Sequence, residues 1–162
     1  MVTATLDRAW DLLARVPDPE LPTVSIVDLG IARDVRLEGD RLVVTITPTY
    51  SGCPAMREIE EDLRAQLSAA FDEVEVRTVL SPPWTSDWIT EQGRARLTAA
   101  GIAPPGARLL PLLVHDAVGR PDACPHCGSP AVEELAAFGS AGCRALWRCT
   151  TCREPFDYFK AH

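Results

Sequence analysis

Four cysteines near the end of the sequence form two Cys-x-x-Cys pairs, and they constrain the fold more than any other feature. The pairs are Cys124 with Cys127 and Cys149 with Cys152, and 21 residues separate them. Two residues between paired thiolates let both sulfurs face one ion from a tight turn, and two such turns give the tetrahedral shell that zinc accepts. Because residues 122–162 are too few to build a large core, metal binding is expected to supply much of their folding free energy.

Two alternatives to zinc are considered at these cysteines. Disulfides are the first, but paired Cys-x-x-Cys cysteines in a chain that shows no secretory leader favour a metal. Iron is the second, because a four-sulfur shell also suits iron and Cys-Pro-x-Cys-Gly resembles a rubredoxin knuckle. Ligand chemistry favours zinc here but does not separate the two metals cleanly.

Two residues close to the pairs are predicted to play smaller parts. His126 lies inside the first pair and is not expected to be a ligand, because four thiolates already fill the shell. Cys143 is a spare thiol six residues before Cys149. It is interpreted as a small buried residue, with a transient accessory metal ligand as the alternative.

Charge and hydropathy exclude several classes of partner. The 162 residues contain 16 Lys and Arg against 23 Asp and Glu, a net charge of −7. An acidic chain is poorly suited to nucleic-acid phosphates or to an anionic membrane face. No apolar run approaches the roughly 20 residues of a transmembrane helix, and the first residues lack the basic start of a signal peptide. We therefore expect a cytoplasmic protein.

Hydrophobic periodicity before the cysteine pairs predicts an α/β (α+β) domain, a small mixed sheet with helices in the order α-β-β-α-β-α. The expected elements are a helix around 6–14, strands at 31–37 and 42–47, a helix from Pro54 to about residue 70, a strand at 74–80 and a helix at 86–100. The domains are predicted as an α/β domain at 1–102, a Pro- and Gly-rich linker at 103–121 and a zinc ribbon at 122–162.

A second reactive position is Cys53, which comes directly before Pro54. If Pro54 is the first helical residue, Cys53 is the N-cap, where backbone N–H groups and the helix dipole favour the thiolate. A merely buried cap cysteine is equally compatible with the local sequence. Asp18, Glu20 and Asp28 lie in an irregular Pro-containing stretch, where they are first of all turn formers and only secondarily candidates for facing a metal.

Several motifs in one order resemble a known family. Asp18-Pro-Glu20, Ser25-Ile-x-Asp28-Leu-Gly30 and Thr47-Pro-Thr-x-x-x-Cys53-Pro54 are similar to the α/β family of metal–sulfur cluster biosynthetic proteins, which includes iron–sulfur assembly factors. Together with Ser81-Pro-Pro-Trp-Thr-Ser-Asp-Trp-Ile89 and the two cysteine pairs, nearly the whole chain resembles the D subunits of phenylacetyl-CoA epoxidase systems. Arg153 departs from the pattern, because a Gly often follows the second pair.

The resemblance implies a role in aerobic phenylacetate degradation, in which a multicomponent monooxygenase epoxidises the ring of phenylacetyl-CoA. It implies a non-catalytic accessory subunit that assists iron or iron–sulfur cluster assembly of the oxygenase or reductase subunit. Besides one structural zinc, it implies a transient iron or cluster at a working thiolate. The residues implied at this site are Cys53, Asp18, Glu20, Asp28 and Thr49.

Two other functions are retained as alternatives. In the first, the chain is a stoichiometric scaffold subunit of the oxygenase, and the ribbon and the loop around Trp84 are docking surfaces. In the second, Cys53 is the nucleophile of an enzyme, although no His or Asn base can be assigned to it. The expected partners are the other epoxidase subunits, and the sequence leaves a homodimer open.

Overall fold

The computed structural model describes residues 2–106 and 119–161, and the chain divides into two compact units, Met1–Trp84 and Thr85–His162. The predicted three-part division stays a prediction, because residues 107–118 of the expected linker lie outside the described residues. None of the helices in the described part has the length and hydropathy of a membrane span.

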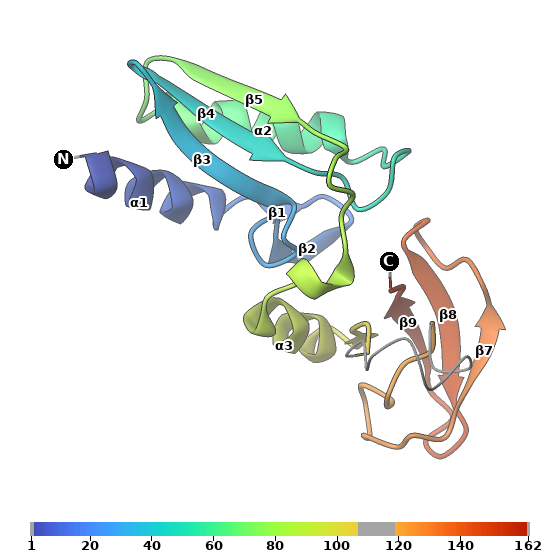
Figure 1. Cartoon of the computed structure of the whole chain (residues 1–162). Helices are drawn as coiled ribbons and strands as arrows, with labels where there is room; N and C mark the ends of the chain where they lie inside the picture. The colour runs from blue at the N-terminus through green and yellow to red at the C-terminus, as the bar shows by residue number, and fades with distance from the viewer. Residues whose placement is uncertain (1, 107–118, 162) are drawn as a thin grey trace. The chain divides into compact units, whose positions relative to one another are not determined.

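The first unit is built around a three-stranded sheet of order β3-β4-β5 (Figure 1). β3 and β4 form an antiparallel hairpin, whereas β4 and β5 are parallel and joined through a helix, the usual crossover between parallel strands. Its elements are α1 (Val2–Leu13), β1 (Pro17–Asp18), β2 (Leu21–Ser25), β3 (Ala32–Glu38), β4 (Arg41–Ile46), α2 (Met56–Ser68) and β5 (Val74–Thr78).

The core of this unit lies between the sheet and its helices. Ile59, Leu63 and Leu67 recur every four residues along α2, so they share one face, and all three are fully buried. Leu42 and Ile46 of β4 are also fully buried. The predicted order of helices and strands is confirmed, and the short β1–β2 pair is an addition that local periodicity did not predict. The single helix predicted at 86–100 is wrong in its bounds, because extended residues at Ile89 and Thr90 separate a short 3-10 turn from a helix that begins at Glu91.

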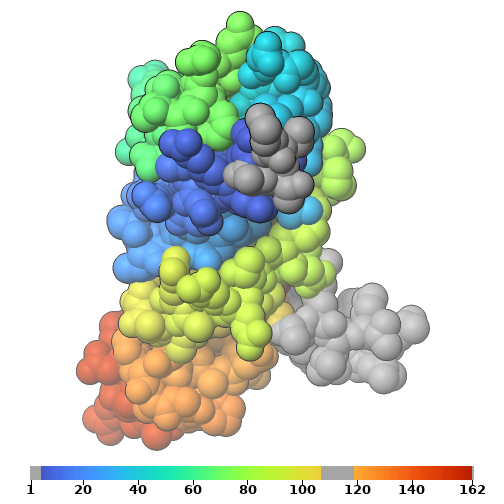
Figure 2. Space-filling view, turned by 90° about the vertical axis from the view of Figure 1, so that its left-hand side faces the viewer, coloured from blue at the N-terminus to red at the C-terminus, as the bar shows by residue number. Residues whose placement is uncertain are grey.

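The second unit joins a helix to the cysteine ribbon. Its elements are η1 (Ser86–Trp88), α3 (Glu91–Ala99), β6 (Ile102–Ala103), β7 (Val132–Ala136), β8 (Arg144–Cys149) and β9 (Pro155–Phe159). The four strands form one sheet of order β6-β9-β8-β7, in which β6 runs parallel to β9. The surface of α3 continues into that of the ribbon in Figure 2. The predicted fold class, a mixed α/β domain followed by a four-cysteine ribbon, is confirmed.

Candidate functional site

The four ribbon cysteines converge on one point. Their sulfur atoms all lie within 4.8 Å of one another. The Sγ atoms of Cys124 and Cys152 are 3.8 Å apart, and those of Cys127 and Cys149 are 3.6 Å apart. A zinc ion with Zn–S bonds of about 2.3 Å at a tetrahedral site requires sulfur–sulfur separations of about 3.8 Å. The donor set therefore fits a metal such as zinc, and the disulfide alternative is wrong, because all six cysteines are unbridged.

Backbone N–H groups donate hydrogen bonds to two of the four ribbon sulfurs. The N–H of His126 donates to Cys124 Sγ at 3.4 Å, and the N–H of Cys152 donates to Cys149 Sγ at 3.5 Å. Donation from the Cys152 N–H lowers the pKa of the Cys149 thiol to about 6. A thiolate is the form that binds a metal, so this donation favours the ligand state of Cys149. Burial and the neighbouring thiols raise the pKa of Cys127 and raise that of Cys152 to about 12 when no metal is bound.

The two turns end in similar backbone conformations with different residues. Gly128 has a φ of +74° and Arg153 a φ of +66°, so both lie in the left-handed region. Glycine enters this region without steric cost, whereas a residue with a Cβ is strained there. Arg153, the residue that departs from the family pattern, is therefore the strained one of the two.

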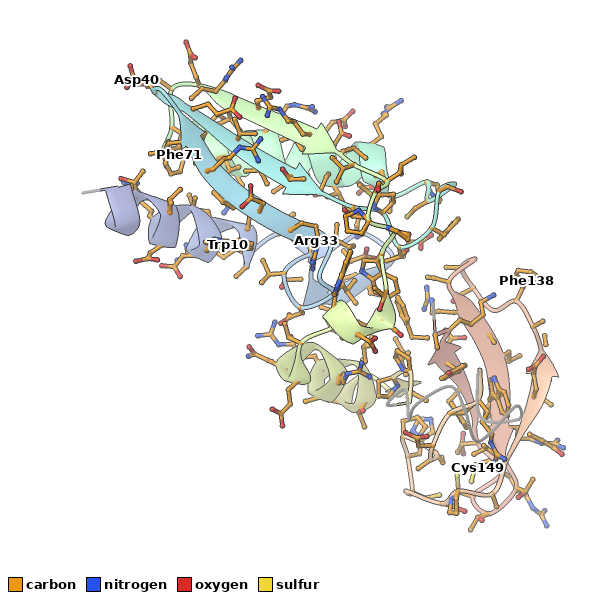
Figure 3. All side chains as sticks on the ribbon, viewed as in Figure 1. Trp10, Arg33, Asp40, Phe71, Phe138 and Cys149 are labelled. Atoms are coloured by element: carbon orange, nitrogen blue, oxygen red, sulfur yellow. The ribbon has the colours of Figure 1, made fainter. Side chains whose placement is uncertain are left out.

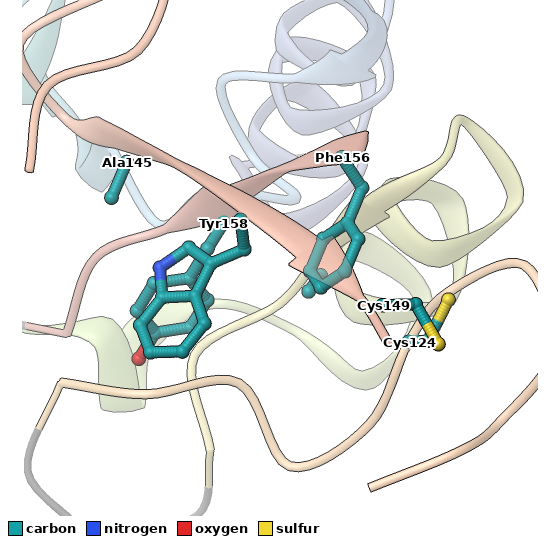
Figure 4. Close-up of a cluster of buried hydrophobic side chains, with 7 residues drawn as sticks. Cys124, Ala145, Cys149, Phe156 and Tyr158 are labelled. Carbon is teal, nitrogen blue, oxygen red and sulfur yellow. The ribbon is translucent and has the colours of Figure 1, made fainter. Parts of the chain in front are cut away.

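Aromatic side chains close the metal centre on its buried side. Trp147, Phe156 and Tyr158 form one buried cluster with Cys124 and Cys149, as Figure 4 shows. The rings of Trp147 and Tyr158 meet edge to face, with centroids 6.0 Å apart. This cluster is the ribbon's core. The other two cysteines are less buried, since Cys127 is exposed and Cys152 is half-buried.

His126 is exposed, but its ring packs against its neighbours on one side. Its ring meets the edge of Phe156, with centroids 6.4 Å apart. A Cβ at Gly101 would lie 3.1 Å from its Cε1, so the ring fits closely over the turn after α3. His126 is absent from the metal-binding group found among the described residues, as predicted. Cys143 is also outside that group and only 5% exposed, in agreement with a buried structural thiol.

Cys53 lies in the loop between β4 and α2, but it does not cap the helix. The N-cap is Ala55, and the first turn closes with the N–H of Ile59 donating to the Ala55 carbonyl. Cys53 belongs instead to a preceding turn, in which its own N–H donates to the Tyr50 carbonyl at 3.1 Å. The predicted N-cap is therefore wrong, because this turn delays the helix start to Met56.

The predicted lowering of the Cys53 pKa is also wrong. Burial raises the pKa of this half-buried thiol. The N–H of Ala55 and the hydroxyl of Thr49 oppose the rise, while the negative charges of Asp18 and Glu20 add to it. The thiol is accordingly protonated at neutral pH when no metal is bound.

The predicted neighbours Asp18, Glu20 and Thr49 act on Cys53. Asp18 and Glu20 act through their charges and Thr49 through a hydrogen bond. Asp18 and Thr49 are themselves buried, and Asp18 Oδ1 also accepts from the Glu20 N–H at 2.9 Å. Asp28 forms a reciprocal pair with Ser25, in which each backbone N–H donates to the other side chain at 3.1 Å.

The Cys53 neighbourhood is not a preformed metal cage. In residues 2–106 and 119–161, the four ribbon cysteines are the one group of three or more ligand side chains that converge closely enough to hold an ion. Thr47, in the same Thr-Pro-Thr motif as Thr49, is buried, and its Oγ1 has no hydrogen-bond partner within the described structure.

Trp84 belongs to the core of the first unit. It is 5% exposed, and its Nε1 donates to the Leu29 carbonyl at 2.9 Å. The Trp84 side chain is therefore not available to a partner, and a docking role of the surrounding loop stays a prediction. A long-range hydrogen bond fixes the indole, and no local pattern in the sequence indicates it.

Comparison with known proteins gives the same two-part organisation. Residues 6–81 match the family described as iron–sulfur cluster assembly protein, and residues 115–160 match the PaaD zinc beta ribbon domain. A crystal structure of a domain of unknown function, DUF59, from Bacillus anthracis is 33% identical, covers 59% of this chain and 92% of its own, and has a TM-score of 0.55.

Two curated relatives bear on the family. An Escherichia coli K12 protein named as the D subunit of 1,2-phenylacetyl-CoA epoxidase is 43% identical over 93% of this chain and 90% of its own length. The Bacillus subtilis Fe-S protein maturation auxiliary factor YitW is 34% identical over 60% of this chain and 97% of its own. With its assembly domain followed by a four-cysteine ribbon, the chain belongs to the PaaD family.

Proposed function

We propose that this chain is a non-catalytic accessory subunit of a phenylacetyl-CoA epoxidase system, and that it passes iron or an iron–sulfur cluster to the oxygenase or reductase subunit through Cys53. The observation that carries the proposal is the half-buried Cys53 thiol under the influence of Asp18, Glu20 and Thr49. The relatives named as an epoxidase subunit and as an Fe-S maturation factor support it.

The raised pKa of Cys53 means that an iron ion must replace a proton on its sulfur in order to bind. The carboxylates of Asp18 and Glu20 disfavour a bare thiolate beside them, but they attract a cation. An arriving iron ion displaces the thiol proton, so that binding of the ion and release of the proton occur together. A thiolate without a converging ligand set holds iron weakly, which suits a donor that must release its cargo.

The ribbon has a separate, structural part in the proposal. Cys124, Cys127, Cys149 and Cys152 hold one zinc ion, which stabilises a sheet with a small core. When bound, the zinc closes the two turns on each other and leaves no open coordination position for chemistry. The cargo metal is therefore assigned to the first unit and the structural metal to the second.

The test is a strain in which Cys53→Ser is the sole D-type subunit. We expect the epoxidase subunits from this strain to carry less iron or cluster and to turn over phenylacetyl-CoA more slowly than the wild type. Cys143→Ala is the matched control, because it removes the other thiol that lies outside the four-cysteine metal site. Normal maturation with Cys53→Ser would contradict the proposal.

A stoichiometric scaffold subunit is the second candidate. Two exposed apolar side chains near the end of β7, Leu135 and Phe138, favour some docking role for the ribbon. A scaffold should co-elute with the mature oxygenase complex in size-exclusion chromatography, whereas a transient factor should elute apart from it. The third alternative, a thiol enzyme, is disfavoured because the pKa of Cys53 is raised rather than lowered.

A further inference from the structure

Four consecutive apolar residues, Leu135-Ala136-Ala137-Phe138, are exposed where β7 ends. Leu135 is 47% exposed and Phe138 is 73% exposed. Single exposed apolar residues are ordinary on protein surfaces, but a run of four is uncommon unless it has a function. We call residues 135–138 the apolar run.

The apolar run continues from an open sheet edge. β7 is the last strand in the order β6-β9-β8-β7, and among the described strands it pairs only with β8. An edge strand presents backbone N–H and C=O groups on which another extended segment can add. Natural edges are commonly protected by charges or bulges. Here the charges of Glu133 and Glu134 precede the apolar run, and the pairing of β7 with β8 shifts register between Glu134 and Ala136.

Phe138 is held in place although it is exposed. Lys160 Nζ lies 4.2 Å from the centre of the Phe138 ring and donates to the Ala137 carbonyl at 3.1 Å. Figure 3 shows Phe138 at the end of the ribbon opposite Cys149. A pre-positioned aromatic side chain loses little conformational freedom on binding, which is typical of an interface anchor.

Charge distinguishes a foreign partner from a second copy. Two β7 strands paired antiparallel with full overlap would place Glu134 opposite its counterpart. Each Glu133 would lie opposite Leu135, and its carboxylate is paired with Arg148 of its own chain. Like charges directly opposite each other across a strand pair are destabilising. A strand with a basic side chain opposite Glu134 and an apolar side chain over Phe138 fits the same edge without this cost.

We propose that the β7 edge and the apolar run dock an extended segment of another epoxidase subunit, one that carries an apolar residue and a neighbouring basic residue. The partner's identity rests on the proposed function, whereas the surface itself rests on the edge, the exposed run and the fixed Phe138 ring. Backbone pairing along β7 supplies affinity, and the Phe138 contact sets the register.

The experiment measures binding of the full-length, zinc-loaded chain to each purified oxygenase and reductase subunit by biolayer interferometry. We expect one subunit to bind the wild type and to bind Phe138→Ala at least about tenfold more weakly, as for an anchor residue. Leu135→Thr, which keeps strand propensity, should also weaken binding. Leu80→Ala is the matched control, because Leu80 is 62% exposed in the first unit.

Three results would overturn this inference: binding that Phe138→Ala leaves unchanged, no binding by any subunit, or a loss of self-association in Phe138→Ala measured by analytical ultracentrifugation. The last would identify a second copy as the occupant. Equal zinc content in the variants shows that the ribbon still folds. The outcome is independent of Cys53, since Cys53→Ser tests maturation and should bind like the wild type.

Discussion

The residue that follows the second cysteine differs between the two turns of the ribbon, and this difference predicts a gain in zinc affinity. Arg153 adopts a φ of +66° where the first turn has Gly128 at +74°. The left-handed conformation costs a non-glycine residue about 1–2 kcal/mol, and glycine loses about 0.5–1 kcal/mol more backbone entropy on folding. Arg153→Gly should therefore stabilise the folded ribbon by about 0.5–1 kcal/mol.

Because metal binding and folding of such a ribbon are coupled, the gain should appear as zinc affinity. A free energy of about 0.5–1 kcal/mol corresponds to roughly two- to fivefold tighter binding. The assay is competition with a chromogenic zinc chelator, after elemental analysis has established about one zinc per chain. Arg153→Ala removes the charge but keeps the Cβ, so its affinity should stay near that of the wild type.

The matched variant at the first turn should lower the zinc affinity instead of raising it. Gly128→Ala places a Cβ at a left-handed residue and should weaken zinc binding by a similar factor. If Arg153→Gly binds zinc no more tightly than Arg153→Ala, the backbone argument is wrong. If Gly128→Ala is neutral as well, the turn conformation itself is wrong.

Two further predictions concern the first unit. Trp84→Phe removes the indole N–H that donates to the buried Leu29 carbonyl. Urea denaturation should therefore show a free energy of unfolding lower by about 1–3 kcal/mol. An unchanged free energy of unfolding would place the indole outside the core. In metal-free protein, iodoacetamide should alkylate Cys53 at pH 8 more slowly than it alkylates a free cysteine, because the pKa of the Cys53 thiol is raised. The rate of Cys53 alkylation should increase above pH 9. Glu20→Gln removes a negative charge that raises this pKa, so it should speed alkylation, and an unchanged or slower rate would refute the electrostatic cause.

Local spacing was sufficient to predict the ribbon. The two Cys-x-x-Cys pairs fix which sulfurs can meet, because each turn is short and the ligands need no distant partner. The amphipathic period of α2 likewise identifies its buried face. Its start was misplaced because the preference of Pro for the first helical position competes with the turn that Tyr50 and Cys53 close.

Long-range features were beyond local reasoning. β6 is two residues long and pairs with β9 more than fifty positions later, so hydrophobic periodicity does not predict it. The environment of Cys53 depends on residues more than thirty positions away, which only the family resemblance brought forward. The sign of its pKa shift depends on burial, and burial follows from the folded loop rather than from its sequence.

The central claim is that iron reaches the epoxidase by way of the Cys53 sulfur. The most direct measurement is the iron and sulfide content of oxygenase and reductase subunits isolated from cells whose D-type subunit is Cys53→Ser, beside cells with Cys143→Ala. The account predicts metal-deficient subunits in the first strain and normally loaded subunits in the second. Fully loaded subunits in both strains would contradict it.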